Sequence, residues 1–374
     1  MRFPIFILLW LAGTSVAAAN GLDSVAKLPV YYEDAPGGQT RFFYDDHYFL
    51  ADKYCPFKAI ERVGHYDFTK RVFEGAFSDF NNVGRPVLRG YYRDGKKEGK
   101  FTAYHPNGQV KWEGTFIQDI PDGPWNYYYP DGKPLLEVTY GSEGLKIQNF
   151  WDRKGEQRVT NGNGKYEFAV EADGYNEFGY VRYNRKGKVV DGRPHGNWTI
   201  EYLFDDGKKA GAGHELYEHG RFIGGYEAYK DEEFFDYPRY RLLPVDFSAR
   251  AEALIGKECS IDEYTGFTGY LSQHLEDWFE GELEVLPDPL TLKFTVSVSH
   301  TGEPEKIQMD TTFANKRYAD LLLIGIHGIP YWFPSFADGE YIDDTLTVTM
   351  EVFPDAAEQK LHFFDVKIQR EKGS

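Results

Sequence analysis

Two histidines in the middle of the chain have the general form of a metal-binding motif. The segment His214-Glu215-Leu216-Tyr217-Glu218-His219 places them five residues apart. Zinc metalloproteases space their histidines by four residues, because that spacing puts both imidazoles on one face of a helix. The neighbouring residues follow the pattern of a repeat strand, not of a helix. The sequence therefore predicts a structural or solvated role for this segment and no metal site.

Other reactive side chains also lack the partners that catalysis needs. Cys259 and His274 would suit a thiol nucleophile and its base, but nothing in the sequence marks Cys259 as an activated thiolate. Glu340 and Asp343-Asp344 would suit a cation, but a polar turn before a strand explains them. The sequence contains no Gly-x-Ser-x-Gly elbow and no phosphate-binding loop. We therefore expect no catalytic residue, no cofactor and no metal.

The chain has two cysteines, Cys55 and Cys259. Exported proteins fold in an oxidising environment, so these thiols are candidates for a disulfide. Two unpaired thiols are the alternative, because the sequence does not give the distance between them. Both states remain open at this point.

The N-terminus predicts the compartment. Residues 1–19 begin with a basic residue, continue through a short apolar run and finish with Ala17-Ala18-Ala19. These three features are typical of a secretory signal peptide. The run is shorter than the roughly 20 apolar residues that span a bilayer. We expect an exported protein of the periplasm or cell envelope that is not transmembrane after cleavage, and an uncleaved membrane anchor is the alternative.

Negative charge is concentrated at the C-terminal end. The net charge is −17, and residues 231–374 hold 12 basic and 28 acidic side chains, a net charge of −16. A field of that sign repels phosphate backbones and anionic lipid head groups. Nucleic acid is therefore not expected as a partner. A basic partner is compatible with this charge, and a simply solvated acidic surface also explains it.

Three blocks of the chain align without a gap at a spacing of 24 residues. Each block contains two glycines with two aromatic residues between them. The positions are Gly75, Phe77, Phe80 and Gly84, then Gly99, Phe101, Tyr104 and Gly108, then Gly123, Trp125, Tyr128 and Gly132. Asn107-Gly108 and Asp131-Gly132 predict tight hairpin turns in which both central residues have positive φ. Apolar residues then fall at every second position, as in a strand with one buried face.

The blocks resemble the MORN-repeat variant found in bacterial exported proteins. The match is strong over residues 70–145 and irregularly spaced as far as about residue 225. We therefore expect an N-terminal segment over residues 20–69 and a β-hairpin array over residues 70–230, with inserted loops or altered strand pairing where the spacing fails. The resemblance implies a binding or structural role without common chemistry. Phe77, Phe101 and Trp125 should form one buried row, whereas outward aromatic residues would suit a glycan or a protein face.

A small α+β module is expected after the array. Residues 231–247, with a charge run and two prolines, predict a linker, residues 248–354 form the module, and residues 355–374 form a tail. The first element of the module is a helix that contains Leu271, Leu275 and Trp278 and that Pro287-Asp288-Pro289 stops. Two strands, over residues 292–298 and 306–309, and a helix over residues 313–326 follow. The last element is a strand that contains Leu346, Val348, Met350 and Val352.

This order of elements resembles the C-terminal domain of TonB energy transducers over about residues 260–354. The matching features are residues 294–298 before Thr301-Gly302, then Trp332-Phe333-Pro334-Ser335, Gly339 and the last strand. The resemblance implies a sheet edge that recruits an extended peptide. The last strand is the candidate edge, and the alternative is that this strand is covered or blunted. The chain departs from the family at Pro287-Asp288-Pro289, where a glycine is usual. The repeats also occupy the place of the anchor and proline-rich linker, which puts energy transduction in doubt.

The sequence thus predicts a mainly β, non-enzymatic, exported interaction or scaffold protein. Its partner would be a protein or peptide of the cell envelope, or a glycan, bound through the repeat sheet or the candidate edge strand. Two alternatives remain. One is an envelope hydrolase that uses acidic residues of the C-terminal third. The other is a TonB-type energy transducer, if residues 1–19 are retained as an anchor.

Overall fold

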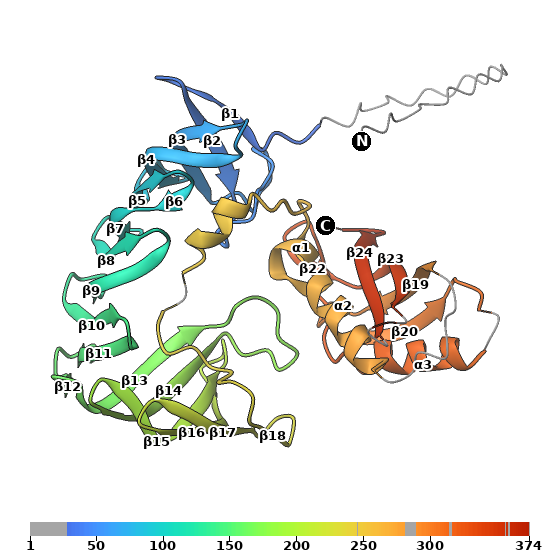
Figure 1. Cartoon of the computed structure of the whole chain (residues 1–374). Coiled ribbons are helices and arrows are strands. Elements are labelled where there is room, and N and C mark those ends of the chain that lie inside the picture. Colours follow the sequence, from blue (N-terminus) through green and yellow to red (C-terminus); the bar gives the residue numbers. More distant parts are fainter. Residues whose placement is uncertain are drawn as a thin grey trace.

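A computed structural model describes residues 28–244, 246–280, 289–313, 316–355, 357 and 360–373. The predicted signal peptide and the Pro287-Asp288 part of the predicted helix stop lie outside these residues. Within the described residues the chain is mainly β, with a long antiparallel sheet of stacked hairpins followed by a smaller sheet with helices (Figure 1). This confirms the predicted fold class.

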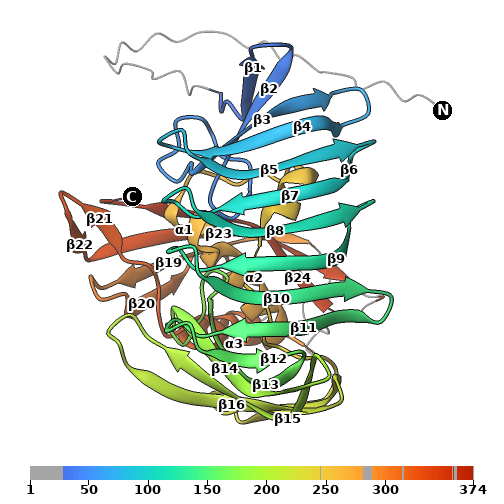
Figure 2. The ribbon, with the colours of Figure 1, turned by 90° about the vertical axis from the view of Figure 1, so that its left-hand side faces the viewer.

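The long sheet is a meander, in which successive strands pair antiparallel, except that β6 and β7 both pair with β5, and the hairpins stack along one direction (Figure 2). Its strands are β1 (Tyr32–Ala35), β2 (Gln39–Tyr44), β3 (Ile60–Asp67), β4 (Val72–Asn81), β5 (Pro86–Arg93), β6 (Lys96–Lys97), β7 (Gly99–Tyr104), β8 (Val110–Ile117), β9 (Ile120–Tyr128), β10 (Pro134–Gly141), β11 (Gly144–Trp151), β12 (Gln157–Thr160), β13 (Asn163–Glu171), β14 (Arg182–Val190), β15 (Arg193–Leu203), β16 (Lys209–Glu218), β17 (Arg221–Glu227) and β18 (Glu232–Phe234). Strands β1–β3 lie before residue 70, so the sheet begins earlier than the predicted array.

The repeated glycine turns are hairpin turns, but of a different type from the one expected. Gly108 and Gly132 have φ of +88° and +82°, as predicted. Asn107 does not have positive φ. The His105 carbonyl instead accepts the Gly108 N–H at 2.8 Å, and the His105 N–H donates to the Gln109 carbonyl at 2.8 Å. This is a three-residue loop with only its last residue left-handed, so the expectation of two positive φ values is wrong.

The first aromatic residue of each block lies in the core of the array, as predicted. Phe77, Phe101 and Trp125 are at most 4% exposed and belong to one hydrophobic cluster. Their rings approach because glycines lie between them. Gly90 of β5 pairs with Phe77 of β4, and the ring of Phe101, which lies in β7, covers the Cα of Gly90. The ring centroids of Phe77 and Phe101 are consequently only 5.7 Å apart, less than the two strand spacings that separate their backbones. The second aromatic residues, Phe80, Tyr104 and Tyr128, are half-buried.

An ion pair is fully enclosed in the same core. Arg62 of β3 contacts Asp79 of β4 through two bonds of 2.8 and 2.9 Å, and neither side chain is exposed. Tyr48 donates to the same carboxylate at 2.9 Å. The Arg62 guanidinium also lies 4.3 Å from the centre of the Phe77 ring. Burying two charges is costly unless each is paired and hydrogen-bonded, and these contacts meet that condition.

The segment that follows the array packs on the array instead of acting as a free linker. After β18, residues 235–244 and 246–247 and the 3-10 helix η1 (Ser248–Ala253) run along the inner face of the curved sheet (Figure 1). The Leu242 carbonyl accepts the Tyr166 hydroxyl at 2.8 Å, and the Tyr240 carbonyl accepts Arg185 at 2.7 Å. We call residues 235–244 and 246–254 the strap. The strap covers apolar surface that the open, curved sheet would otherwise leave in water.

The C-terminal module contains the predicted order of helices and strands. Its elements are α1 (Ile261–Thr265), α2 (Phe267–Trp278), β19 (Leu290–Val298), β20 (Pro304–Met309), α3 (Lys316–His327), β21 (Ser335–Ala337), β22 (Glu340–Ile342), β23 (Asp344–Asp355) and β24 (Lys360–Arg370). Four strands form a sheet in the order β20-β19-β23-β24, and β21 and β22 form a separate hairpin. The side chains of α2 and α3 share one core with this sheet.

The predicted edge strand is wrong. Leu346, Val348, Met350 and Val352 lie in β23, which pairs with β19 on one side and with β24 on the other. All four side chains are buried against the helices. Strand β24 comes from residues that the sequence pattern assigns to a tail, and it covers the edge that a bound peptide would have used. Recruitment of a peptide at that edge is therefore excluded in this structure.

Candidate functional site

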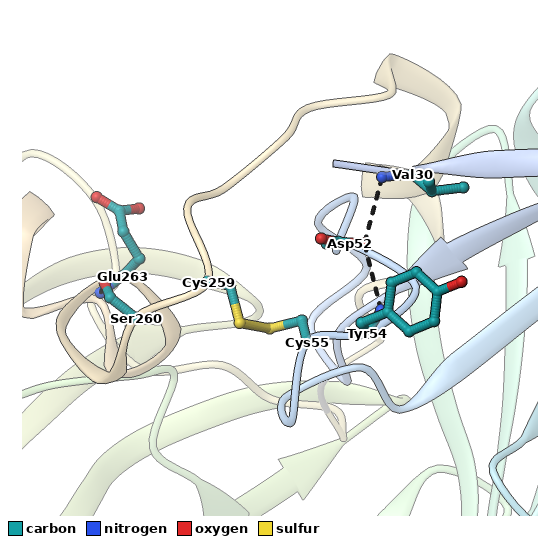
Figure 3. The surroundings of a disulfide bond; sticks show 7 residues. All are labelled: Val30, Asp52, Tyr54, Cys55, Cys259, Ser260 and Glu263. Atoms are coloured by element: carbon teal, nitrogen blue, oxygen red, sulfur yellow. Dashed lines mark hydrogen bonds between the residues drawn. A yellow bond between two sulfur atoms is a disulfide. The ribbon is translucent and has the colours of Figure 1, made fainter. Parts of the chain in front are cut away.

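A disulfide joins the array to the C-terminal module. Cys55, in the loop between β2 and β3, bonds to Cys259, directly before α1 (Figure 3). The side chain of Ser260 accepts the Glu263 N–H at 3.2 Å and caps α1 at the same place. The disulfide alternative for the two cysteines is therefore confirmed. It also removes Cys259 as a nucleophile, because a sulfur in a disulfide has no thiolate form.

A loop between β13 and β14 makes the second connection. Tyr175 donates its backbone N–H to the Thr265 carbonyl at 2.7 Å and its hydroxyl to the Tyr331 carbonyl at 2.8 Å. Its ring lies 5.0 Å from the Phe267 ring and 4.5 Å from the Tyr270 ring. The loop interrupts the repeat where the spacing in the sequence becomes irregular, which confirms the expected insertion there.

The loop and the strap enclose a pocket of about 250 Å³, which we call the junction pocket. Residues of the loop, of the beginning of β14 and of the strap line it. They are Glu171, Ala172, Asp173, Gly174, Tyr175, Asn176, Tyr180, Tyr183, Arg239 and Arg241. The lining thus combines aromatic rings with carboxylate, amide and guanidinium groups, which provide both donors and acceptors.

The charges in the junction pocket are balanced. Arg241 contacts Asp173 at 2.9 Å. Arg239 makes two bonds of 2.9 Å to Glu232, outside the lining, and its guanidinium lies 4.2 Å from the centre of the Phe234 ring. Glu171 is exposed. With two carboxylates and two guanidinium groups in the lining, the pocket has no strong preference for either sign of charge.

The tyrosines at the pocket wall are fixed by their neighbours. The Tyr180 ring stacks on the Tyr202 ring at 3.8 Å. Burial raises the pKa of Tyr180 to about 12, so its hydroxyl stays protonated at neutral pH. The Tyr183 hydroxyl accepts the Arg241 N–H at 2.9 Å, and its ring meets the Tyr240 ring edge-on. The wall is therefore organised before any ligand arrives, which lowers the entropy cost of binding.

A group of acidic residues and a histidine lies near the disulfide, and the side chain of each residue already makes a hydrogen bond. Asp45, Asp46 and His47 place one potential ligand atom each within 4.8 Å of one another. Asp45 accepts the backbone N–H groups of His47 and Phe49, at 3.0 and 2.8 Å. Asp46 contacts His47 at 2.6 Å, and this hydrogen bond raises the histidine pKa. Burial lowers the pKa of the neighbouring Lys257. We interpret the group as a turn that orders the loop before Cys55.

Other residues considered from the sequence also have structural contacts. His214 lies in β16 and His219 in the turn after it, which confirms a strand in place of a zinc-binding helix. Asp344 is buried and accepts the Ser335 hydroxyl at 2.6 Å, and Asp343 pairs with His300 at 2.9 Å. Sequence reasoning missed every residue that lines the junction pocket. The sequence feature that could have indicated the pocket is the break in the 24-residue period, where an insertion rich in tyrosine and polar residues stands.

No protein-family model matches the chain, and no curated protein matches it. None of the helices in the described residues is long and apolar enough to cross a membrane.

Proposed function

We propose that the chain is an exported binding protein and that its junction pocket takes one sugar unit of an uncharged glycan. The observation that carries this proposal is the lining of the pocket, where tyrosines, an amide and two balanced pairs of charged groups surround about 250 Å³. The strap and the array act as a rigid frame for this site. The disulfide supports export, because such bonds persist in oxidising compartments.

The chemistry of the lining favours a hydroxyl-rich ligand. Sugar hydroxyls both donate and accept hydrogen bonds, and Asp173 and Arg241 offer the complementary groups. The Asn176 amide bonds the backbone of Tyr180 and holds the loop that carries these groups. The rings of tyrosines suit the apolar faces of a pyranose. An anionic ligand would gain little, because each guanidinium in the lining already has a carboxylate. The volume lies below the roughly 300–1,000 Å³ of pockets for drug-sized ligands, which favours a single sugar unit.

Binding of neutral oligosaccharides to the mature, disulfide-bonded protein tests this proposal. Glycan arrays would identify a ligand, and titration calorimetry would measure its affinity. Arg241→Met should weaken binding about tenfold or more, since the loss of one hydrogen bond to a charged group is worth roughly 1.5–3 kcal/mol. Arg221→Met is the matched control, because Arg221 forms a comparable exposed pair with Glu218 far along the sheet. No binding by the wild-type protein, or equal losses in both variants, would exclude the pocket as a glycan site.

One observation favours hydrolysis as a second candidate function. Glu171 and Asp173 both line the junction pocket, and most glycoside hydrolases use two carboxylates that flank the scissile bond. Release of reducing ends from a bound oligosaccharide, abolished in Glu171→Gln, would establish an enzyme. Binding without turnover would leave the binding proposal in place.

Export is tested separately. We propose cleavage after Ala19, with Asn20 as the first residue of the mature protein, because residues 1–19 have the pattern of a signal peptide. N-terminal sequencing of protein from the native host measures this directly. Recovery of Met1 or Arg2 would contradict cleavage and favour the anchored energy-transducer alternative.

A further inference from the structure

A short hairpin of the C-terminal module exposes two aromatic rings. Phe336 of β21 and Tyr341 of β22 are 45% and 62% exposed. Their ring centroids lie 5.3 Å apart in an edge-to-face arrangement, so the rings form one continuous apolar surface. Figure 2 shows this hairpin at the outer margin of the module. Large aromatic side chains that lie together on an exposed hairpin indicate a potential contact surface.

The hairpin holds these rings on a fixed frame. Asp338 and Gly339 both have positive φ, +50° and +91°, which is the two-residue turn that matches the twist of paired strands. Ser335, at the base of the hairpin, is fully buried. Its hydroxyl donates to Asp344 at 2.6 Å and accepts Arg370 at 3.0 Å. The rings are therefore presented in one orientation, and a partner would not have to order them.

Unpaired carboxylates lie next to the rings. Asp338 and Glu340 are exposed, and in the described part of the chain neither has an ion-pair partner. Lys372 donates to the backbone carbonyl of Asp343 at 2.9 Å, and within the described residues it forms no ion pair with either carboxylate. This local charge lies within the acidic third of the chain, whose net charge is −16.

We propose that the hairpin patch, formed by Phe336, Tyr341, Asp338 and Glu340, docks a Lys- or Arg-rich segment of a partner protein. Aromatic faces attract ammonium and guanidinium groups, and carboxylates add charge-assisted hydrogen bonds to the same groups. The acidic field of the module raises the rate at which such a segment encounters the patch. The patch shares no residue with the junction pocket, so this inference does not depend on the glycan proposal.

The test uses the whole mature protein and a fluorescently labelled Lys/Arg-rich peptide, with anisotropy as the readout at low and physiological ionic strength. Asp338→Asn and Asp365→Asn form a matched pair, because both aspartates are exposed, both have positive φ and both changes alter net charge equally. Phe364→Ala, which removes an exposed ring from the four-stranded sheet, is the control for Tyr341→Ala.

We expect Tyr341→Ala and Asp338→Asn each to weaken peptide binding about fivefold, the factor that corresponds to roughly 1 kcal/mol for an exposed cation–π contact or ion pair. Phe364→Ala and Asp365→Asn should leave the affinity unchanged, and circular dichroism should show all four variants folded. Failure of the peptide to bind would overturn the proposal. Equal losses from Asp338→Asn and Asp365→Asn would overturn it too, since they would indicate a general effect of charge and no local site.

Discussion

The close approach of glycine and tryptophan between neighbouring hairpins predicts a large effect from one added methyl group. Gly114 of β8 lies under Trp125 of β9, and a Cβ at Gly114 would lie 2.1 Å from the nearest ring carbon. Trp125 is 4% exposed. Its ring stacks on Trp112 at 4.9 Å and meets Phe116 edge-on at 5.0 Å. The ring has no free space to move into, so Gly114→Ala must displace several core side chains.

The size of the effect follows from that overlap. Carbon atoms in contact lie about 3.5–4.0 Å apart, so the new methyl group penetrates the ring by more than an ångström. Overpacking a core typically costs about 1–3 kcal/mol, and we expect the upper end of that range for Gly114→Ala. At about 2–4 °C per kcal/mol for a unit of this size, the melting temperature should fall by roughly 6–12 °C.

Thermal and urea unfolding of the purified mature protein measure this loss. Gly141→Ala is the matched control, because Gly141 also lies in a strand at ordinary φ but no atom lies within 4 Å of the place its methyl group would take. Its effect should stay within about 0.5 kcal/mol. In a protein that already carries Trp125→Leu, Gly114→Ala should lower the free energy of unfolding clearly less, since the smaller leucine side chain leaves room for the new methyl group. An unchanged melt for Gly114→Ala, or the same cost in both backgrounds, would refute this account of the packing.

The contacts of the array lead to three further predictions. Reduction of the Cys55–Cys259 bond should lower the free energy of unfolding by up to about 5 kcal/mol, as the chain-entropy model gives for a long loop; mass spectrometry without reductant should detect the bond, and two freely alkylated thiols would contradict it. Asp79→Ala should lower the free energy of unfolding, measured in urea, by about 3–5 kcal/mol, because it leaves the buried Arg62 guanidinium unpaired. A decrease below about 1 kcal/mol would contradict the buried ion pair. The hydrogen bond that the His47 ring donates to the Asp46 carboxylate raises the pKa of His47. Its stabilisation is therefore complete below the ordinary pKa of about 6.5 and disappears as pH rises through the folded value. His47→Gln should be less stable than wild type near pH 6 and equal to it near pH 8.

The hairpins can be predicted because their signals are local. A glycine at positive φ closes the turn of each repeated block, at Gly84, Gly108 and Gly132, and the buried side alternates with the exposed side over the next strand. The burial of Phe77, Phe101 and Trp125 follows from this pattern. The turn type does not, because Asn-Gly occurs both in two-residue turns and in the three-residue loop that Gly108 closes. Only the backbone hydrogen bonds around His105 distinguish the two.

Strand β24 escapes prediction because its alternation is interrupted. Leu361, Phe363 and Val366 face the core, so the spacing changes from two residues to three. Asp365 has φ of +52°, and the pairing with β23 shifts in register in the same strand. An extra residue of this kind moves the following side chains to the other face. The sequence pattern of β24 therefore predicts an irregular tail, and without β24 the pattern predicts that β23 is the edge strand.

The strap and the junction pocket could not be derived from local patterns. The strap has two prolines and no regular element before η1, so nothing in its own sequence indicates that Tyr240 and Leu242 contact the array. Its position depends on apolar surface that is created only when the sheet curves. The pocket likewise joins residues near 175 with residues near 240, which no periodicity connects.

The regular part of a hairpin array places no restriction on what the chain carries after it. Each repeat contacts mainly its neighbours, so identical units would leave the C-terminal module free to take many positions. The contacts that do fix the module all come from parts that depart from the repeat, namely the loop holding Tyr175, the loop holding Cys55 and the strap. Because these departures have no use in stacking hairpins, they are where a binding surface can form without weakening the array. The junction pocket lies among them, and this is the physical reason to test the proposed glycan binding there and not along the repeated strands.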